Sequence, residues 1–111
     1  MSDAMKLTYV AGPYRGKVRR NIRIADRVGR EIAENGDFPI VPHNNTRRWE
    51  KKTNLQHHDY IVGDLLILSR CDAIVMLPKW QESEGAKVEH SMARYWGLPV
   101  YYYPDIGGDE K

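Results

Sequence analysis

Residues 72–104 read "DAIVMLPKWQESEGAKVEHSMARYWGLPVYYYP" and contain a strand, a helix and a second strand. Segment 72–78 is apolar through its middle, which is typical of a buried strand. In segment 83–97 apolar residues recur at steps of three and four, and Gly97 ends the pattern, so we expect a helix there. A strand over 98–104 follows. Because such a unit usually connects parallel strands of one sheet, this stretch predicts a parallel α/β fold.

The same alternation covers the rest of the chain. We expect strands at 6–12 and 38–42, helices at 17–36 and 58–71, and a polar loop with a short helical turn at 43–56. The resulting β-α-β-α-β-α-β order predicts a flavodoxin-like or Rossmann-like three-layer α/β sandwich with a small parallel sheet of four or five strands. We expect a single domain over 1–111, with loose ends at about 1–4 and 105–111.

Composition narrows the class of function. The formal net charge of +2 gives no reason to expect nucleic acid as a partner, and no apolar run reaches the length of a membrane span. A single cysteine, Cys71, excludes an internal disulfide and favours a cytoplasmic protein. The four histidines match no compact zinc motif, so we expect neither a metal nor a cofactor. Basic residues near 15–23 and 47–52 are either solvated surfaces or a positive rim for a phosphate-bearing ligand.

Two carboxylates occupy positions where their helices need apolar residues. On a helical wheel, Glu89 lies at the middle of the apolar stripe of its helix, between Ala86 and Ala93. Asp64 holds the corresponding position on the preceding helix, between Ile61 and Leu68. A buried carboxylate is costly unless it is paired. Each residue is therefore either a structural ion-pair partner or a working carboxylate, and a surface charge is the weakest interpretation.

Both carboxylates can reach one cleft. Ligands of parallel α/β sheets bind beyond the carboxyl ends of the strands, where the loops at 12–16, 42–45 and 78–85 should gather. Asp64 lies eight residues before Asp72, where the next strand starts, and eight residues of helix span roughly 12 Å, enough to bring Asp64 back toward the carboxyl edge of that strand. Glu89 lies in the second turn of the helix that leaves the same edge. Two such carboxylates suit displacement at an anomeric carbon, with one as nucleophile and the other positioning the sugar or handling a proton.

Three motifs carry a resemblance to a known family. "YVAGPYRG" (9–16), Asp64 ahead of "CDAIVMLP" (71–78), and "SEGAKVEHSMARYWGLPV" (83–100) resemble the nucleoside 2-deoxyribosyltransferase-like superfamily over about residues 6–103. The spacing of Ser83, Gly85 and Glu89 is the most specific part. Within the superfamily the sequence is most similar to the 2'-deoxynucleoside 5'-monophosphate N-glycosidases and to small uncharacterised relatives from bacteria and phages.

The resemblance implies roles for individual residues. Glu89 corresponds to the nucleophile, Asp64 to the acid that contacts the sugar and assists protonation of the leaving group, and Tyr9 to a tyrosine that hydrogen-bonds the nucleophile. Ser83 falls where the monophosphate hydrolases bind phosphate and the free-nucleoside transferases carry aspartate; it is equally suited to be a helix N-cap. The phosphate or sugar would further meet the loop and turn residues Gly12, Arg15, Gly16 and Gly85.

Two aromatic side chains remain open to two interpretations each. His43 could contact a base or phosphate, or be an ordinary loop histidine. Trp80 could stack on a nucleobase or pack on its own loop. His90 lies about 100° from Glu89 on the wheel, so we expect it to face solvent or a neighbouring subunit.

Taken with the resemblance, the sequence predicts hydrolysis of the N-glycosidic bond of a (2'-deoxy)nucleoside 5'-monophosphate through a covalent glycosyl–Glu89 intermediate. One alternative is a nucleoside 2-deoxyribosyltransferase that exchanges bases. Another is a non-catalytic module that binds or senses nucleotides. The expected partners are a small-molecule nucleotide or nucleoside and further copies of the chain, in a homodimer or higher homo-oligomer.

Overall fold

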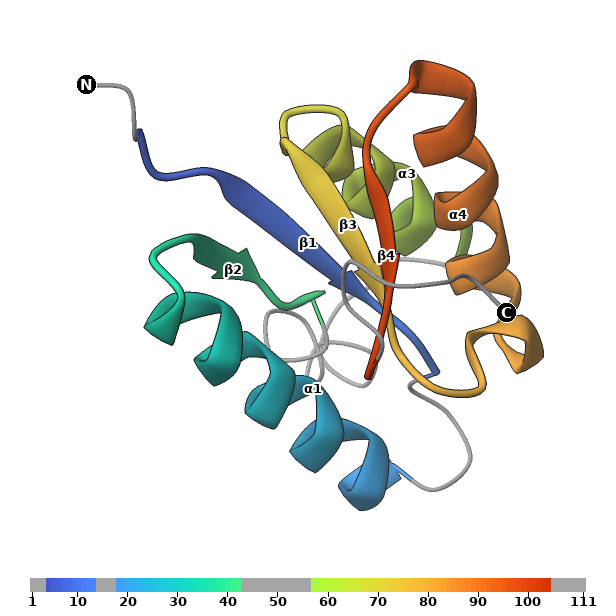
Figure 1. Cartoon of the computed structure of the whole chain (residues 1–111). Helices are drawn as coiled ribbons and strands as arrows, with labels where there is room; N and C mark the ends of the chain where they lie inside the picture. Colours follow the sequence, from blue (N-terminus) through green and yellow to red (C-terminus); the bar gives the residue numbers. More distant parts are fainter. Residues whose placement is uncertain (1–3, 14–17, 43–56, 105–111) are drawn as a thin grey trace.

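The computed structural model describes residues 4–13, 18–42 and 57–104, which form a sheet with helices on both faces (Figure 1). Every strand and helix that the sequence predicts in these ranges is present, so the α/β alternation is confirmed. The predicted helical turn within 43–56 lies outside the described residues. In chain order the elements are β1 (Leu7–Ala11), α1 (Val18–Glu34), β2 (Phe38–Ile40), α3 (His57–Leu68), β3 (Ala73–Met76), η1 (Trp80–Glu82), α4 (Glu84–Trp96) and β4 (Val100–Tyr102).

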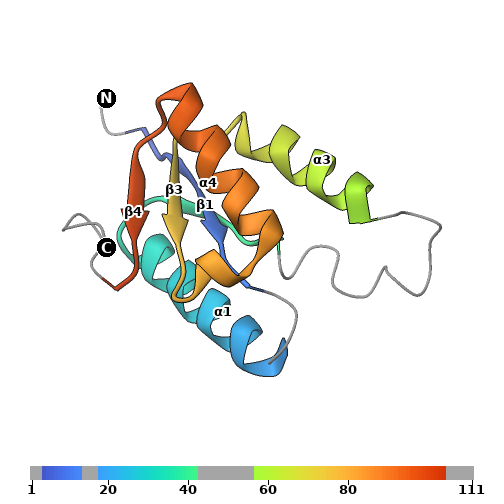
Figure 2. The same cartoon turned by 90° about the vertical axis from the view of Figure 1, so that its right-hand side faces the viewer.

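The sheet contains four described strands in the order β2-β1-β3-β4, and all neighbouring pairs are parallel. Tyr9 of β1 lies beside Ile40 of β2 and Ile74 of β3, at the centre of the sheet. The strands point toward the end of the sheet from which α4 starts (Figure 2). The start of α4 therefore lies at the carboxyl edge of the sheet, where parallel α/β proteins bind ligands.

Alternation along the strands gives the sheet two separate apolar faces. One face packs against α1, through a core of Val10, Ala25, Val28, Ile32, Val75 and Leu77. The other packs against α3 and α4, through Tyr9, Ala11, Leu68, Cys71, Ile74, Met76, Ala86 and Ala93. Figure 1 shows α1 on one side of the sheet and α3 with α4 on the other, so the predicted three-layer sandwich is confirmed. Within the described ranges no helix has both the length and the apolar character needed to cross a membrane.

Helix α4 has the ends that its sequence predicts. The Ser83 hydroxyl accepts a hydrogen bond of 3.1 Å from the backbone N–H of Ala86, which satisfies one of the free donors in the first turn. At the other end, Gly97 adopts a φ of 80° and its N–H bonds to the carbonyls of Ala93 and Arg94. The caps fix where α4 begins and ends, and thereby where Glu89 lies above the sheet.

The connection into α4 differs from the prediction. The sequence predicts a loop over 78–85, but Trp80–Glu82 form the 3-10 helix η1. It starts at Lys79, whose φ of 66° is left-handed. Lysine rarely adopts this conformation, so the residue type gave no signal for it. The end of α3 also differs from the prediction: the helix ends at Leu68 and not at residue 71. Just after Leu68, the Ser69 hydroxyl donates a 2.6 Å hydrogen bond to the carbonyl of Leu66.

A close approach of two chain segments fixes the carboxyl edge of the sheet. Gly12 follows β1 and is buried. A Cβ at this position would lie 2.6 Å from Cβ and 2.8 Å from Cδ1 of Leu77, which follows β3. The Leu77 N–H also donates a 2.8 Å hydrogen bond to the carbonyl of Ala11. Only glycine allows the two segments to lie this close.

We predict that Gly12→Ala lowers the free energy of unfolding by about 1–3 kcal/mol, because the new methyl group must displace Leu77. Gly63→Ala is the matched control. Outside α3, no atom of the described residues lies within 4 Å of a Cβ at Gly63 in the middle of this helix, and alanine there gains up to about 1 kcal/mol of helix propensity. Urea unfolding of both variants tests this. Equal loss of stability in the two variants, or none in Gly12→Ala, contradicts the assignment of Gly12 to a tight contact.

Candidate active site

The centre of the candidate site is a hydrogen bond between β1 and α4. The hydroxyl of Tyr9 donates to Oε2 of Glu89 over 2.7 Å. Tyr9 is fully buried and Glu89 is 8% exposed. The small side chains of Ala86 and Ala93, on either side of Glu89 in the buried stripe of α4, let this helix lie close to the sheet. The structure thus brings together Tyr9 and Glu89, and the surface-charge interpretation of Glu89 is excluded.

The surroundings of Glu89 oppose its ionisation. The pKa of the Glu89 carboxyl is raised to about 8 as the net result of three effects: burial raises it, the hydrogen bond from Tyr9 lowers it, and the charge of Asp64 raises it. The largest of these effects is the loss of solvent. As a result, the carboxyl changes its protonation state near neutral pH, where an ordinary glutamate is fully ionised.

Asp64 belongs to the same electrostatic environment. It comes from α3, is partly buried, and burial raises its pKa to about 6. Its charge contributes to the raised pKa of both Glu89 and Tyr9. Two carboxyl groups on neighbouring helices therefore influence each other's protonation across the face of the sheet that α3 and α4 cover.

Tyr9 is held in its neutral form. Burial raises the pKa of its hydroxyl well above the ordinary value, and the charge of Glu89 is the next largest cause. Because the hydroxyl keeps its proton, Tyr9 acts as a hydrogen-bond donor to Glu89 and not as a base.

Ser83 and Gly85 lie at the start of α4. The structure shows the cap role of Ser83, whose hydroxyl bonds to the Ala86 N–H; the proposed phosphate contact is an additional role that the described residues do not test. Among the described residues, the nearest atom that a Cβ at Gly85 would meet is the Ser83 hydroxyl oxygen, 4.0 Å away. The amino end of α4, with its free N–H groups, suits an anion.

The other predicted ligand residues fall into two groups. Gly12 lies at the carboxyl edge of the sheet beside Leu77, as described above. Arg15, Gly16 and His43 lie outside the described residues, so their proposed contacts with phosphate, sugar or base stay predictions.

Trp80 packs against its own molecule. The ring centroids of Trp80 and His90 are 4.2 Å apart, and Nε2 of His90 lies 2.7 Å from the hydroxyl of Tyr102. This cluster joins η1, α4 and β4 beside the apolar core. For Trp80, the structure favours packing on the protein over an open stacking surface. His90 does not point freely into solvent, because its ring is partly buried and packs against Trp80 and Tyr102; a contact with a neighbouring subunit stays a prediction.

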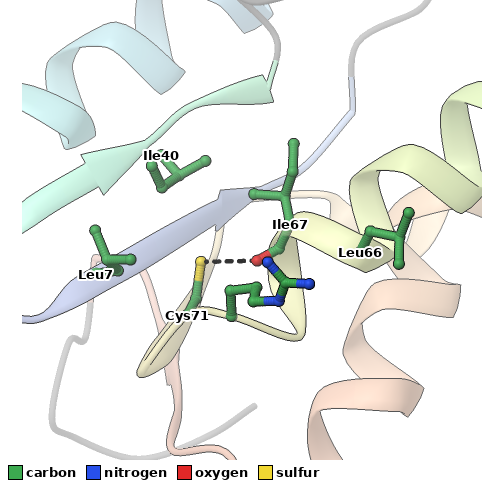
Figure 3. A pocket seen from close by; sticks show the side chains of 6 residues that line it. Leu7, Ile40, Leu66, Ile67 and Cys71 are labelled. Carbon is green, nitrogen blue, oxygen red and sulfur yellow. Dashed lines mark hydrogen bonds between the residues drawn. The ribbon is translucent and has the colours of Figure 1, made fainter.

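A cavity of about 360 Å³ lies on the same face of the sheet (Figure 3), and neither Tyr9 nor Glu89 is among the residues that line it. Its lining is apolar except for Arg70, and consists of Leu7, Ile40, Leu66, Ile67, Arg70 and Cys71. Cys71 is not a nucleophile here, since burial and the charge of Asp72 raise the pKa of its thiol to about 11. No local sequence pattern predicts this cavity, because residues 7, 40 and 66 meet only in the folded chain.

In the part of the chain that the structure describes, no three His, Cys, Asp or Glu side chains lie close enough together to hold a metal ion.

Comparisons with known proteins bear on the family and the fold. The model of a family described as "Domain of unknown function (DUF4406)" matches residues 5–102. No curated protein matches the chain significantly.

Three solved structures are similar in fold. A 2-deoxyribosyltransferase from Bacillus psychrosaccharolyticus has a TM-score of 0.71 at 15% identity, over 95% of this chain and 77% of that one. A conserved protein from Enterococcus faecalis V583 has a TM-score of 0.69 at 21% identity, over 89% of this chain and 63% of that one. A 2-desoxiribosyltransferase from Leishmania mexicana has a TM-score of 0.62 at 17% identity, over 88% of this chain and 63% of that one.

These similarities show that the fold is that of the 2-deoxyribosyltransferases, as the sequence motifs led us to expect. The chain spans less than two thirds of the length of the proteins from Enterococcus and Leishmania.

We predict opposite shifts of the Glu89 titration in two variants. Tyr9→Phe removes the hydrogen bond that lowers the pKa of Glu89, so the midpoint should move above about 8. Asp64→Asn removes the charge that raises it, so the midpoint should move down. Carbon-13 NMR of the side-chain carboxyl groups measures both.

Tyr103→Phe is the control for this titration. It also removes a tyrosine–glutamate hydrogen bond, from Tyr103 to Glu31 over 3.3 Å, but next to α1 on the other face of the sheet. The Glu89 midpoint should not change in this variant. A midpoint that moves in the same direction in Tyr9→Phe and Asp64→Asn contradicts the described environment.

Proposed function

The chain belongs to the DUF4406 family, and we propose that this member cleaves the N-glycosidic bond of a 2'-deoxynucleoside or its 5'-monophosphate. The observation that carries the proposal is the buried Tyr9–Glu89 hydrogen bond, with Asp64 close enough to alter the ionisation of both groups. A buried ion pair would need a cation beside Glu89. What Glu89 has is a neutral donor and a second carboxyl group, an arrangement that favours a working carboxylate.

The first step is displacement at the anomeric carbon. An oxygen of ionised Glu89 attacks C1', the C1'–N bond breaks, and its electron pair leaves with the base. Asp64 in its protonated form gives its proton to the departing base. The products of this step are the free base and a deoxyribosyl ester of Glu89. The Tyr9 hydroxyl orients the carboxylate and holds its charge before the attack.

The coupling between the two carboxyl groups determines how many protons the pair carries. With a pKa of about 6 for Asp64 and about 8 for Glu89, the pair shares one proton near neutral pH. When the proton is on Asp64, that group carries no charge, and ionisation of Glu89 becomes easier. Near neutral pH the proton lies mainly on Glu89, so the productive state, with Glu89 ionised and Asp64 protonated, requires transfer of this proton from Glu89 to Asp64.

A second nucleophile resolves the ester and regenerates Glu89. If it is a nitrogen of another base, the reaction is base exchange; if it is water, the reaction is hydrolysis. The two solved structures named 2-deoxyribosyltransferases favour exchange as the first candidate. Hydrolysis of a monophosphate is the second candidate, and the hydroxyl of Ser83 at the amino end of α4 favours a phosphate there.

We expect the wild-type protein to release free base from at least one member of a panel of 2'-deoxynucleosides and their 5'-monophosphates. Chromatography of the reaction mixtures measures this. Glu89→Gln should lower the rate by about a thousandfold or more, because the amide retains the shape but cannot form the ester. Glu82→Gln, an exposed position in η1, is the control and should react like the wild type.

Adding a second, different base distinguishes the two fates of the ester. Formation of a new nucleoside or nucleotide supports exchange, and free base with deoxyribose or its 5-phosphate supports hydrolysis. If the wild type releases no base from any substrate but binds a nucleotide, the chain is a binding module and the proposed chemistry is wrong. If Glu89→Gln is as fast as the wild type, Glu89 is not the nucleophile.

A further inference from the structure

Two adjacent residues of α4 contact tyrosines of the two strands that flank β3. Glu89 accepts a hydrogen bond from Tyr9 of β1, and Nε2 of His90 lies 2.7 Å from the hydroxyl of Tyr102 of β4. β1 and β4 are the neighbours of β3 in the sheet. Because adjacent positions differ by about 100° around a helix, the two contacts together resist rotation of α4 about its axis. The proposed reaction uses only the first of them.

Tyr102 gives His90 a fixed partner at the carboxyl edge of the sheet. It lies beside Met76, the last residue of β3, and Met76 in turn lies beside Ala11, the last residue of β1. The N–H of Tyr103 donates a 2.9 Å hydrogen bond to the carbonyl of Met76. The contact with Tyr102 therefore ties His90 to the edge at which parallel α/β proteins bind ligands.

The His90 ring also packs against Trp80 of η1. The centroids of these two rings are 4.2 Å apart, with an angle of 31° between the ring planes. The centroids of Trp80 and Tyr102 are 6.3 Å apart. The three rings thus form one aromatic cluster, and His90 is the member that contacts both of the others.

The short helix η1 depends on this cluster for its position. None of its three residues is buried, and it begins at Lys79 with a left-handed φ of 66°. A left-handed conformation costs free energy in any residue with a Cβ, and it persists only where the surrounding structure enforces it. Packing of Trp80 against His90 and Tyr102 supplies a tertiary contact that stabilises η1 in this form.

The position of Trp80 determines that of Ser83. The N–H of Ser83 donates a 3.0 Å hydrogen bond to the carbonyl of Trp80, and its hydroxyl caps α4 at Ala86. A displacement of Trp80 would therefore move the end of α4 at which a 5'-phosphate is proposed to bind. Glu89 lies further along α4 and has its own contact with Tyr9. Loss of the aromatic cluster should thus disturb the phosphate end of the site more than the carboxyl end.

We propose that His90 is a positioning residue that determines the preference of the site for a 5'-monophosphate over a free nucleoside. It holds Trp80 in place, and Trp80 holds Ser83 where its hydroxyl and the N–H groups of the first turn of α4 can bind phosphate oxygens. His90 itself does not touch the substrate. The inference rests on the proposed function in one respect, that nucleosides and nucleotides bind at this site.

Isothermal titration calorimetry tests the proposal in the Glu89→Gln background, where the ester cannot form and the ligand is not consumed. The ligands are a 2'-deoxynucleoside and its 5'-monophosphate. Adding His90→Leu should raise the Kd of the monophosphate by about tenfold and that of the nucleoside by less than about twofold, because only the monophosphate uses the Ser83 end of α4. A general loss of structure would instead raise both Kd values alike.

Two further variants show whether stacking on Trp80 is the cause. His90→Phe should retain most of the monophosphate affinity, since its ring can still stack on Trp80. Tyr95→Leu is the control: Tyr95 is 84% exposed on α4 and lies outside the aromatic cluster, so both Kd values should stay unchanged.

A double-mutant cycle and hydrogen exchange test the pathway from His90 to Ser83. Trp80→Leu should have the same effect as His90→Leu, and the double variant should be no weaker than either, because both changes remove the same contact. In NMR hydrogen exchange without ligand, the N–H groups of Ser83 and Ala86 should lose protection in His90→Leu, while those of β1 keep theirs.

Equal losses for the two ligands in His90→Leu, a His90→Phe variant as weak as His90→Leu, additive losses in the cycle, or unchanged exchange at Ser83 overturn the proposal. It is also wrong if the Glu89→Gln chain binds the monophosphate no better than the nucleoside, whether or not the wild type releases base. If the variants behave as expected but the wild type releases no base from any substrate, the proposed function is wrong and the positioning role of His90 stands.

Discussion

The structure depends on how one buried carboxyl group is accommodated. Glu89 lies in the apolar stripe of α4, and its partner is the hydroxyl of Tyr9 at the centre of the sheet. Burial without a partner would be costly, so the position of α4 on the sheet, the alanines on either side of Glu89, and the rotamer of Tyr9 all have to satisfy this one contact. The caps at Ser83 and Gly97 and the aromatic cluster around His90 fix α4 in the position that does so.

The hydrogen bond from Tyr9 does not fully offset the effect of burial on Glu89, and the raised pKa makes the stability of the fold depend on pH. The pKa of Glu89 in the folded chain, about 8, exceeds the ordinary value of 4.5. The native state therefore binds the proton more tightly than the unfolded chain does. The stability that this contributes is fully present below the ordinary pKa and is lost as the pH rises through about 8. A residue kept only for stability would be apolar here, so the arrangement makes more sense as part of a reaction than as part of the core.

The sequence predicted the frame of the molecule well, because strands and helices in a small α/β protein follow local periodicity and cap residues. It also placed Glu89 and Asp64 on the inner sides of their helices, since the helical wheel needs no tertiary information. The partnership of Tyr9 with Glu89 came only from the family motifs, as the two residues are 80 positions apart.

The features that the sequence did not predict all depend on tertiary contacts. A helical wheel of α4 alone places His90 on the outer side of the helix, but in the folded chain Trp80 of η1 and Tyr102 of β4 pack against it on that side. The 3-10 helix η1 depends on a left-handed Lys79 that no pattern marks.

The central claim is that Glu89 forms a covalent bond to the sugar, and trapping that ester tests it most directly. The protein is mixed with a substrate that releases base, quenched in acid within the first turnovers, digested, and examined by mass spectrometry. Our account predicts a peptide containing Glu89 with the added mass of one deoxyribosyl or deoxyribosyl-phosphate group, and no such peptide from Glu89→Gln. Release of base with the adduct on another residue, or with no adduct while Glu89→Gln remains active, would contradict it.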